Sequence, residues 1–443
     1  MKIINRFLNF ILTLGVINIF PLLKSDIPVV SEKLFVPVII LLFVVSEYIC
    51  RGEERAFSEK KLRRLASGCR LIAKSGWLLL FEIPVLVIAF MRLELGVLYG
   101  ILSVAEPLIL ITIWLIGGIL RAAVSSRQIK LTNYIALLCL WWMPIANIIL
   151  IRKFYKTARR ELFTESARLE LENAREESRI CRTKYPVLLV HGIFFRDWQL
   201  LNYWGRIPAA LKRNGAEFYY GGQQSASSVA ESAAELRDRI IDVIRQTGAE
   251  KINIIAHSKG GLDSRYAISN LGMDKYVATL TTINTPHLGC DMVDYLLDRL
   301  PQGLIDFVTA RYNGIFRKLG DRNPDFIAGV RDLSARRCVE LNKEMPDSSE
   351  VSYRSFMSVM SSAGSAGFPL NIGYMLIKQL NGANDGLVWE KSAVHGDFKL
   401  LTTPKKRGIS HGDVIDLMRE NIDDFDVREM YVQIVSELKN EGY

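Results

Sequence analysis

The chain has 443 residues, more than one ordinary domain needs, and 49% of them are hydrophobic. Charge is divided unevenly, because residues 1–182 carry 25 Lys and Arg against 15 Asp and Glu, whereas the remainder carries 31 against 32. The excess positive charge therefore flanks the apolar runs of the first part, a pattern typical of membrane topology; no nucleic acid is expected as a partner. Six scattered cysteines without CxxC spacing argue against a disulfide framework and a zinc site.

The first third of the chain is dominated by apolar runs close to the length that crosses a bilayer. A spanning helix needs about 20 apolar residues. The runs are Phe7–Leu23, Leu34–Ile49, Gly76–Met91, Gly96–Leu120 and Leu131–Ile151. The first could instead be a signal peptide, but no cleavage site follows it. Residues 1–152 are therefore predicted to be a multi-pass transmembrane region, with the lipid bilayer of the cell membrane as a partner.

The basic loops between these runs predict the orientation. Residues 51–75 and 121–130 are rich in Lys and Arg and are expected in the cytoplasm. Five crossings then place the rest of the chain outside. The basic cluster 152–160 argues against this placement, and if one run does not cross, the C-terminal part becomes cytoplasmic.

After the apolar runs, residues 153–183 read as a charged amphipathic helix that links the two parts. Strands and helices then alternate over 184–443. Strands are expected at 186–190, 217–220, 252–256, 276–284, 352–360 and 398–402, and helices at 207–214 and 228–247. This alternation predicts an α/β domain with a mostly parallel sheet and helices on both faces.

The stretch from Ile252 to Gly261 carries the strongest functional signal. An apolar strand runs directly into Ala256-His257-Ser258-Lys259-Gly260, and a helical pattern follows. A serine on a sharp strand-to-helix turn is the setting of a catalytic nucleophile, and the small residues on either side leave room for the turn. Ser258 is the predicted nucleophile.

A nucleophilic serine needs a base, and the base needs an acid that holds its tautomer. The candidate acid is Asp385, in the turn-rich segment Asn384-Asp385-Gly386. His411 follows the last expected strand and is favoured as the base over His395, which precedes that strand. His257 adjoins the serine and is expected to point elsewhere.

Two backbone N–H groups are expected to stabilise the oxyanion. One belongs to Lys259, the residue after the nucleophile, whose side chain is expected in solvent. The other is assigned to Ile193, after the early strand and the pair His191-Gly192.

Residues 184–420 resemble the bacterial triacylglycerol lipases of the α/β-hydrolase superfamily. The resemblance is carried by the following motifs: Tyr185-Pro186-Val187-Leu188-Leu189-Val190-His191-Gly192, Tyr203-Trp204-Gly205-Arg206, the Ser258 turn, Asn284-Thr285-Pro286-His287, Asn384-Asp385-Gly386 and Ser410-His411-Gly412-Asp413. It implies the α/β-hydrolase fold, the Ser258–Asp385–His411 triad and a lid at 291–331.

The family also implies a structural calcium ion in many members, for which Asp413 is a weak candidate ligand. A second aspartate is missing between 357 and 384. The prediction is therefore that no metal or cofactor is needed.

Together these observations predict a membrane-anchored lipase or esterase that cleaves lipid esters through an acyl-enzyme. Two alternatives stay open: a lipid acyltransferase that uses the same triad, and an inactive hydrolase fold that serves as a membrane interaction module.

Overall fold

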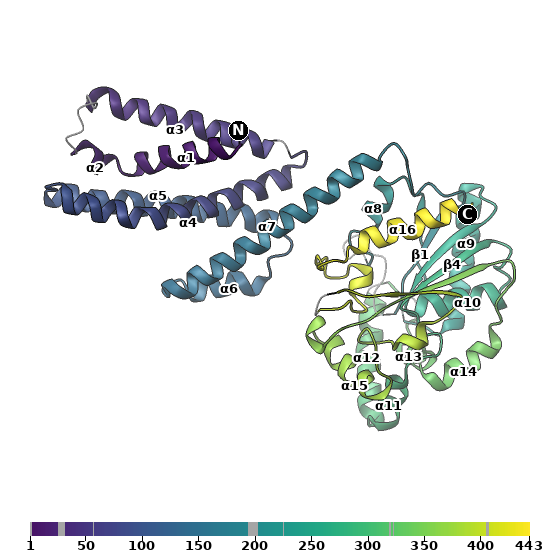
Figure 1. The fold of residues 1–443 in the computed structure, drawn as a ribbon. Helices are drawn as coiled ribbons and strands as arrows, with labels where there is room; N and C mark the ends of the chain where they lie inside the picture. The colour runs from purple at the N-terminus through teal and green to yellow at the C-terminus, as the bar shows by residue number, and fades with distance from the viewer. Residues whose placement is uncertain are drawn as a thin grey trace. The chain divides into compact units, whose positions relative to one another are not determined.

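The computed structural model describes residues 2–24, 32–55, 57–193, 203–224, 226–318, 320–321, 323–404 and 407–443. The chain forms two compact units, Met1–Leu171 and Glu172–Tyr443 (Figure 1).

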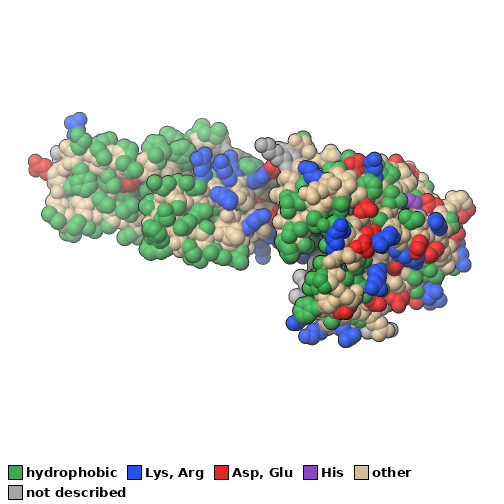
Figure 2. Space-filling view, turned by 90° about the horizontal axis from the view of Figure 1, so that it is seen from below, with side chains coloured by type: hydrophobic (Ala, Val, Ile, Leu, Met, Phe, Trp, Pro, Cys, Tyr) green, Lys and Arg blue, Asp and Glu red, His purple; other side chains and the backbone are tan. Residues whose placement is uncertain are grey.

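The described residues of the first unit form helices joined by short loops. Its helices are α1 (Lys2–Ile17), α2 (Ile19–Leu23), α3 (Glu32–Arg55), α4 (Lys60–Arg92), α5 (Val97–Ser125), α6 (Leu131–Cys139) and α7 (Pro144–Arg175). Three segments are long and apolar enough to cross a membrane: Phe35–Gly52, Lys60–Arg92 and Val97–Ser125. Hydrophobic side chains cover much of this unit's surface (Figure 2), as expected for helices that face lipid.

The last apolar run differs from its prediction. Residues 131–151 do not form one helix, because α6 ends at Cys139 and α7 begins at Pro144. A residue before proline avoids the helical conformation, so the chain turns here. The Asn147 side chain closes the turn by donating hydrogen bonds to the carbonyl oxygens of Leu140 (3.0 Å) and Trp141 (2.6 Å).

The two helices therefore form a hairpin. Tyr134 of α6 packs edge-on against Phe154 of α7, with ring centroids 5.8 Å apart. Glu161 of α7 accepts hydrogen bonds from the backbone N–H groups of Arg127 (3.0 Å) and Gln128 (3.3 Å), which precede α6. The chain thus returns to the residues that follow α5, and residues 131–151 are not one continuous spanning helix. The number of crossings stays a prediction. The same α7 continues to Arg175 through the segment predicted as a linker.

The second unit contains the predicted sheet. Its strands are β1 (Val187–Val190), β2 (Phe218–Tyr220), β3 (Ile252–His257), β4 (Val277–Ile283), β5 (Ser352–Ser358) and β6 (Asp397–Leu401). Its α-helices are α8 (Ile207–Arg213), α9 (Val229–Thr247), α10 (Lys259–Asn270), α11 (Asp291–Arg299), α12 (Gln302–Lys318), α13 (Phe326–Asp332), α14 (Ala335–Glu344), α15 (Leu370–Leu380) and α16 (Val427–Asn440).

The six strands pair in the order β2-β1-β3-β4-β5-β6, and every pairing is parallel. Alternate side chains of β1 enter opposite layers: Leu189 packs in a cluster with residues of α8 and α16, whereas Leu188 packs with residues of α9 and α10. Helices therefore cover both faces, which confirms the predicted α/β-hydrolase architecture. Because the strands are parallel, their carboxyl ends share one edge, where ligands bind in such sheets.

Candidate active site

Ser258 lies between β3 and α10 at the carboxyl edge of the sheet. Its backbone has φ +55° and ψ −131°, a conformation that an L-residue adopts only under strain. Close contacts around the turn explain the small residues that the sequence places there. A Cβ atom at Gly260 would lie 2.4 Å from the carbonyl oxygen of His191. The packing therefore holds the serine on a sharp turn, the arrangement expected of a nucleophile.

Asp385 and His411 meet on two loops that are both attached to the end of β5. The loop of Asp385 is held where Met360 N–H donates to the Asn384 carbonyl (2.8 Å), and that of His411 where Ile409 N–H donates to the Val359 carbonyl (2.8 Å). His411 Nδ1–H then donates to Asp385 Oδ2 across 2.7 Å.

The Asp385 carboxylate is fixed by three further donors. Asn284 Nδ2 donates to Oδ2 (2.6 Å), and the backbone N–H groups of Leu387 and Val388 donate to Oδ1 (2.8 Å each). Asp385 is fully buried. The carboxylate therefore has one orientation, and with Nδ1 of His411 occupied as donor, Nε2 is the nitrogen available to accept a proton.

His411 lies beside the serine turn. Its ring centroid is 4.5 Å from that of His257, the residue directly before Ser258. His257 itself is buried, and burial lowers its pKa well below the ordinary value, with His411 contributing in the same direction. A neutral buried histidine fits a packing role, in line with the expectation that His257 is not the base.

His395 lies elsewhere. Its backbone N–H donates to Ser355 Oγ (2.9 Å), and its ring lies edge-on to Tyr353 near the start of β5. Its Nε2 is 3.2 Å from Asp347. The structure thus pairs Asp385 with His411 beside the turn of Ser258, and the triad of these three residues stays a prediction. His395 lies before β6, toward the amino edge of the sheet.

The backbone of His191-Gly192-Ile193 passes directly beside the nucleophile. A Cβ atom at Gly192 would lie 2.8 Å from Ser258 Cβ, so only glycine fits. Ile193 follows, with its side chain in a buried cluster with Val229, Leu262 and Phe316. Lys259 is the first residue of α10, where a backbone N–H has no acceptor within the helix. Both predicted oxyanion donors are therefore near the serine, and their role stays a prediction.

The Lys259 side chain is buried. The prediction that it lies in solvent is wrong, because it is only 1% exposed. Its Nζ donates to Asp263 Oδ1 (2.7 Å) and to Ser232 Oγ (2.9 Å), which joins α10 to α9. Burial raises the pKa of Asp263 to about 6, against the opposing effect of the Lys259 ammonium. An i, i+4 spacing of Lys259 and Asp263 was the available signal for this buried pair.

Tyr203 and Asn284 are site residues to which the sequence assigned no role. The Tyr203 hydroxyl accepts from Gly192 N–H (3.0 Å) and lies 2.6 Å from His257 Nδ1. Asn284, which has φ +48°, also donates to Ser358 Oγ (2.7 Å). Both belong to motifs that carried the lipase resemblance, so the motif was a signal for them even though their contacts were not predictable.

The surroundings of Asp413 do not fit a calcium ion. Its carboxylate accepts from Ser410 N–H (2.9 Å) and Oγ (2.7 Å) and pairs with Arg407 (3.1 Å). Burial raises its pKa, which disfavours the charged form that a cation needs. Among the residues that the structure describes, no group of three or more His, Cys, Asp or Glu side chains could hold a metal ion.

The predicted lid segment forms α11, α12 and most of α13, with residues 319 and 322 outside the described part. α12 packs through Phe316 into the cluster that contains Ile193. Its other face exposes Leu304, Phe307 and Ile315 to solvent. Helix α12 is thus attached beside Ile193 and has an apolar outer face, as expected of a lid that contacts lipid. Its role as a lid stays a prediction.

Comparisons with known proteins agree with this architecture. Residues 187–297 match the sequence profile of the family described as "Putative serine esterase (DUF676)". A triacylglycerol lipase of Pseudarthrobacter phenanthrenivorans is 34% identical over 176 residues, which are 37% of this chain and 54% of that protein. A triacylglycerol lipase of Burkholderia plantarii is also 34% identical over 176 residues, 37% of this chain and 49% of that protein. The chain thus spans about half the length of these curated relatives.

Among solved structures, a Staphylococcus hyicus lipase aligns with 19% identity and a TM-score of 0.47, covering 58% of this chain and 96% of that one. Glu172–Tyr443 therefore has the architecture of an α/β-hydrolase and is similar in sequence to serine esterases and triacylglycerol lipases.

Proposed function

We propose that this chain is a membrane-attached serine hydrolase that cleaves carboxylic esters of lipids. The observation that carries the proposal is the 2.7 Å hydrogen bond from His411 to the buried Asp385, made beside the strained turn of Ser258. A nucleophile, a base and an acid in this relation are the minimum that acyl transfer to water needs.

In the proposed reaction, Ser258 Oγ attacks the acyl carbonyl while His411 Nε2 takes its proton. The backbone N–H groups of Lys259 and Ile193 stabilise the oxyanion, and Asp385 stabilises the imidazolium. The tetrahedral intermediate then expels the alcohol, which receives the proton from His411. Water, deprotonated by His411, hydrolyses the acyl-enzyme and releases the carboxylic acid. Every step uses side chains and backbone of this chain, and we propose no cofactor.

Lipid esters are the proposed substrates for two reasons. Three helices are able to cross a membrane and would hold the hydrolase near acyl chains. Helix α12 presents Leu304, Phe307 and Ile315 outward, and we propose that 291–331 acts as a lid that moves at a lipid surface.

We further propose that the hydrolase lies on the cytoplasmic side. Glu161 after the hairpin contacts both Arg127 and Lys61, with 3.8 Å between Lys61 Nζ and Glu161 Oε1. The chain therefore enters the hydrolase from the level of the basic loops 51–75 and 121–130, which prefer the cytoplasm. The extracytoplasmic placement expected from five crossings rested on the fifth run, which is a hairpin.

The test is product analysis on the full-length chain in vesicles that contain triacylglycerol or diacyl glycerophospholipid. We expect release of free fatty acid by the unchanged chain and none by Ser258→Ala. Transfer of the acyl group to an added alcohol with no free acid, or equal release by both chains, would contradict hydrolysis at Ser258.

A further inference from the structure

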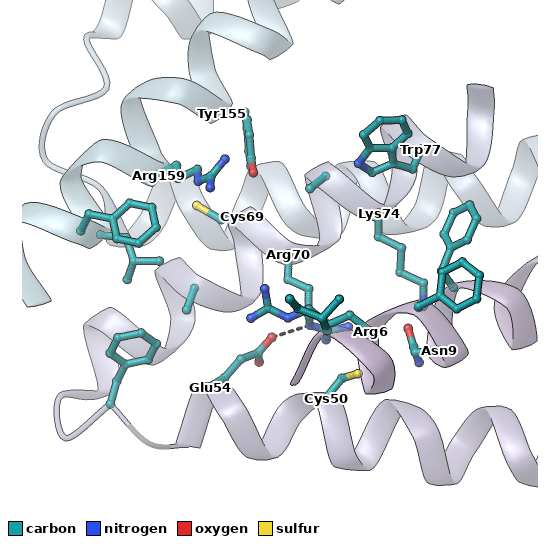
Figure 3. A pocket seen from close by; sticks show the side chains of 18 of the residues that line it. Arg6, Asn9, Cys50, Glu54, Cys69, Arg70, Lys74, Trp77, Tyr155 and Arg159 are labelled. Carbon is teal, nitrogen blue, oxygen red and sulfur yellow. Dashed lines mark hydrogen bonds and ion pairs between the residues drawn. The ribbon is translucent and has the colours of Figure 1, made fainter. Parts of the chain in front are cut away.

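A second candidate site lies in the helical unit, within residues 1–171. It is a cavity of about 710 Å³ between α1, α3, α4 and α7 (Figure 3). The size falls in the range of pockets that hold small molecules and lipid headgroups. It lies where α3 ends and α4 begins, so one side meets the apolar spans and the other meets the basic loop.

One wall of the cavity is cationic. Arg6 of α1, Arg70 and Lys74 of α4 and Arg159 of α7 line it, with Glu54 as the carboxylate among the lining residues. Figure 3 shows Arg6, Glu54, Arg70, Lys74 and Arg159 around the cavity. Cations at the end of a membrane bundle attract the anionic headgroups of the adjacent leaflet.

Some of this charge is already paired. Arg70 binds Glu54 (2.6 Å) and Glu47 (3.0 Å), and Lys74 also binds Glu47. Arg159 differs, because among the described residues it has no carboxylate partner. Its guanidinium instead stacks over Tyr155 and Phe163, 5.9 Å and 5.4 Å from the ring centroids. Arg159 is therefore available to an anion, and Arg6 lines the same cavity.

Aromatic side chains also line the cavity: Phe7 and Phe10 of α1 and Trp77 and Phe81 of α4. The Phe10 and Phe81 rings meet edge-on, with centroids 5.4 Å apart. Trp77 and Phe7 are largely exposed on the outer surface of the bundle. Tryptophan is enriched where a membrane protein passes from headgroups to acyl chains. The cavity is thus lined by both cationic and aromatic side chains.

The positive surface continues along α7. A shallower hollow of about 520 Å³ shares Tyr155, Arg159 and Phe163 with the first and adds cationic side chains. These are Arg152, Lys156 and Arg160. The same basic segment, which opposes export of the C-terminal part, would lie against an anionic leaflet.

We propose that this cavity binds an anionic glycerophospholipid. The phosphate is held by Arg159 together with Arg6, and the first part of an acyl chain lies against Phe10, Trp77 and Phe81. Charge complementarity selects an anionic head, and the aromatic side chains select a lipid over a free phosphate ion. The proposal does not depend on the hydrolase reaction, since all its residues lie in the first unit.

The test uses the full-length chain in neutral detergent and measures lipid retained in native mass spectrometry. Phosphatidylglycerol should be retained at least tenfold more tightly than phosphatidylcholine. The variant Arg6→Gln/Arg159→Gln should lose at least tenfold in phosphatidylglycerol affinity. The matched control Arg64→Gln/Arg121→Gln removes the same charge from helices α4 and α5 outside the cavity and should lose less than twofold.

Two further experiments separate lipid binding from misfolding and from phosphate binding. Trp77→Ala keeps every charge and should still weaken phosphatidylglycerol binding, which separates loss of the site from misfolding of the arginine variant. Inorganic phosphate at millimolar concentration should not displace the lipid. Equal retention of both lipids, equal losses in both double variants, or displacement by phosphate alone would overturn the proposal.

Discussion

Ser258, Asp385 and His411 each follow a strand of the same parallel sheet, and His411 binds Asp385 beside the turn of Ser258. The turn at Ser258 was predictable from the sequence, because a sharp turn admits only small residues on either side of the serine. The contact of Asn284 with Asp385 left no comparable trace in the sequence, since it joins residues 101 positions apart. The catalytic residues were therefore predictable from local sequence patterns. The hydrogen-bond partners that orient their side chains were not, because those partners come together only in the folded chain.

The triad gives a prediction at the level of single residues. Ser258→Ala and His411→Ala should each lower kcat on the order of 10⁶-fold, because nucleophile and base act as a unit. Asp385→Asn should cost about 10⁴-fold by favouring the wrong tautomer of His411. The measurement is the hydrolysis rate of a soluble short-chain ester. His395→Ala is the control and should stay active; an inactive His395→Ala beside an active His411→Ala would reverse the assignment.

The buried pair of Lys259 and Asp263 gives a second prediction. Lys259→Met leaves the Asp263 carboxyl buried without its cation, so the free energy of unfolding should fall by about 3–5 kcal/mol. Adding Asp263→Asn removes the stranded carboxyl and should recover most of that loss. Denaturation of the hydrolase unit, followed in the full chain by tryptophan fluorescence, measures both. A double variant as unstable as Lys259→Met alone would show that the pair is not coupled.

At the scale of elements, all six strands and the helices α8 and α9 were predictable from periodicity, with ends displaced by at most two residues. Buried parallel strands read as apolar runs, and α9 shows a helical spacing of apolar residues. The hairpin of α6 and α7 was not predictable from hydropathy alone. Its apolar run has the length of a span, and the break depends on Pro144 and the side chain of Asn147.

Helix α12 carries the prediction at this scale. Leu304→Ser/Phe307→Ser removes two exposed apolar side chains and leaves Phe316 packed in the cluster. Hydrolysis of a long-chain ester in vesicles should fall at least tenfold, because moving each such side chain out of water is worth roughly 1.5–3 kcal/mol. Hydrolysis of a short soluble ester should not change.

The matched control for α12 is Val339→Ser, which removes an exposed apolar side chain from α14. It should leave both rates as they are. Two results would refute a lid function. One is a long-chain ester rate that is the same in Leu304→Ser/Phe307→Ser as in the unchanged chain. The other is a rate that does not rise when the ester exceeds its solubility limit.

At the scale of the whole molecule, orientation in the membrane is the property most sensitive to a single element. Whether the chain crosses the membrane again after the basic loop 121–130 decides the side of the hydrolase, and residues 131–151 form a hairpin at that point. We predict that protease added to intact cells or spheroplasts leaves the hydrolase unit uncut, whereas protease added to inverted membrane vesicles degrades it. An outer-facing membrane protein is the internal control. Cleavage of the hydrolase in intact cells would contradict the cytoplasmic placement and would support a fifth crossing.

The central claim is that Ser258 is an activated nucleophile in a lipid ester hydrolase. The most direct measurement is labelling of the full-length chain with a fluorophosphonate, followed by peptide mapping of the adduct. The account predicts one adduct on Ser258, abolished in His411→Ala and prevented by prior incubation with a hydrolysable lipid ester. An unlabelled Ser258, or labelling that is unchanged in His411→Ala, would contradict it.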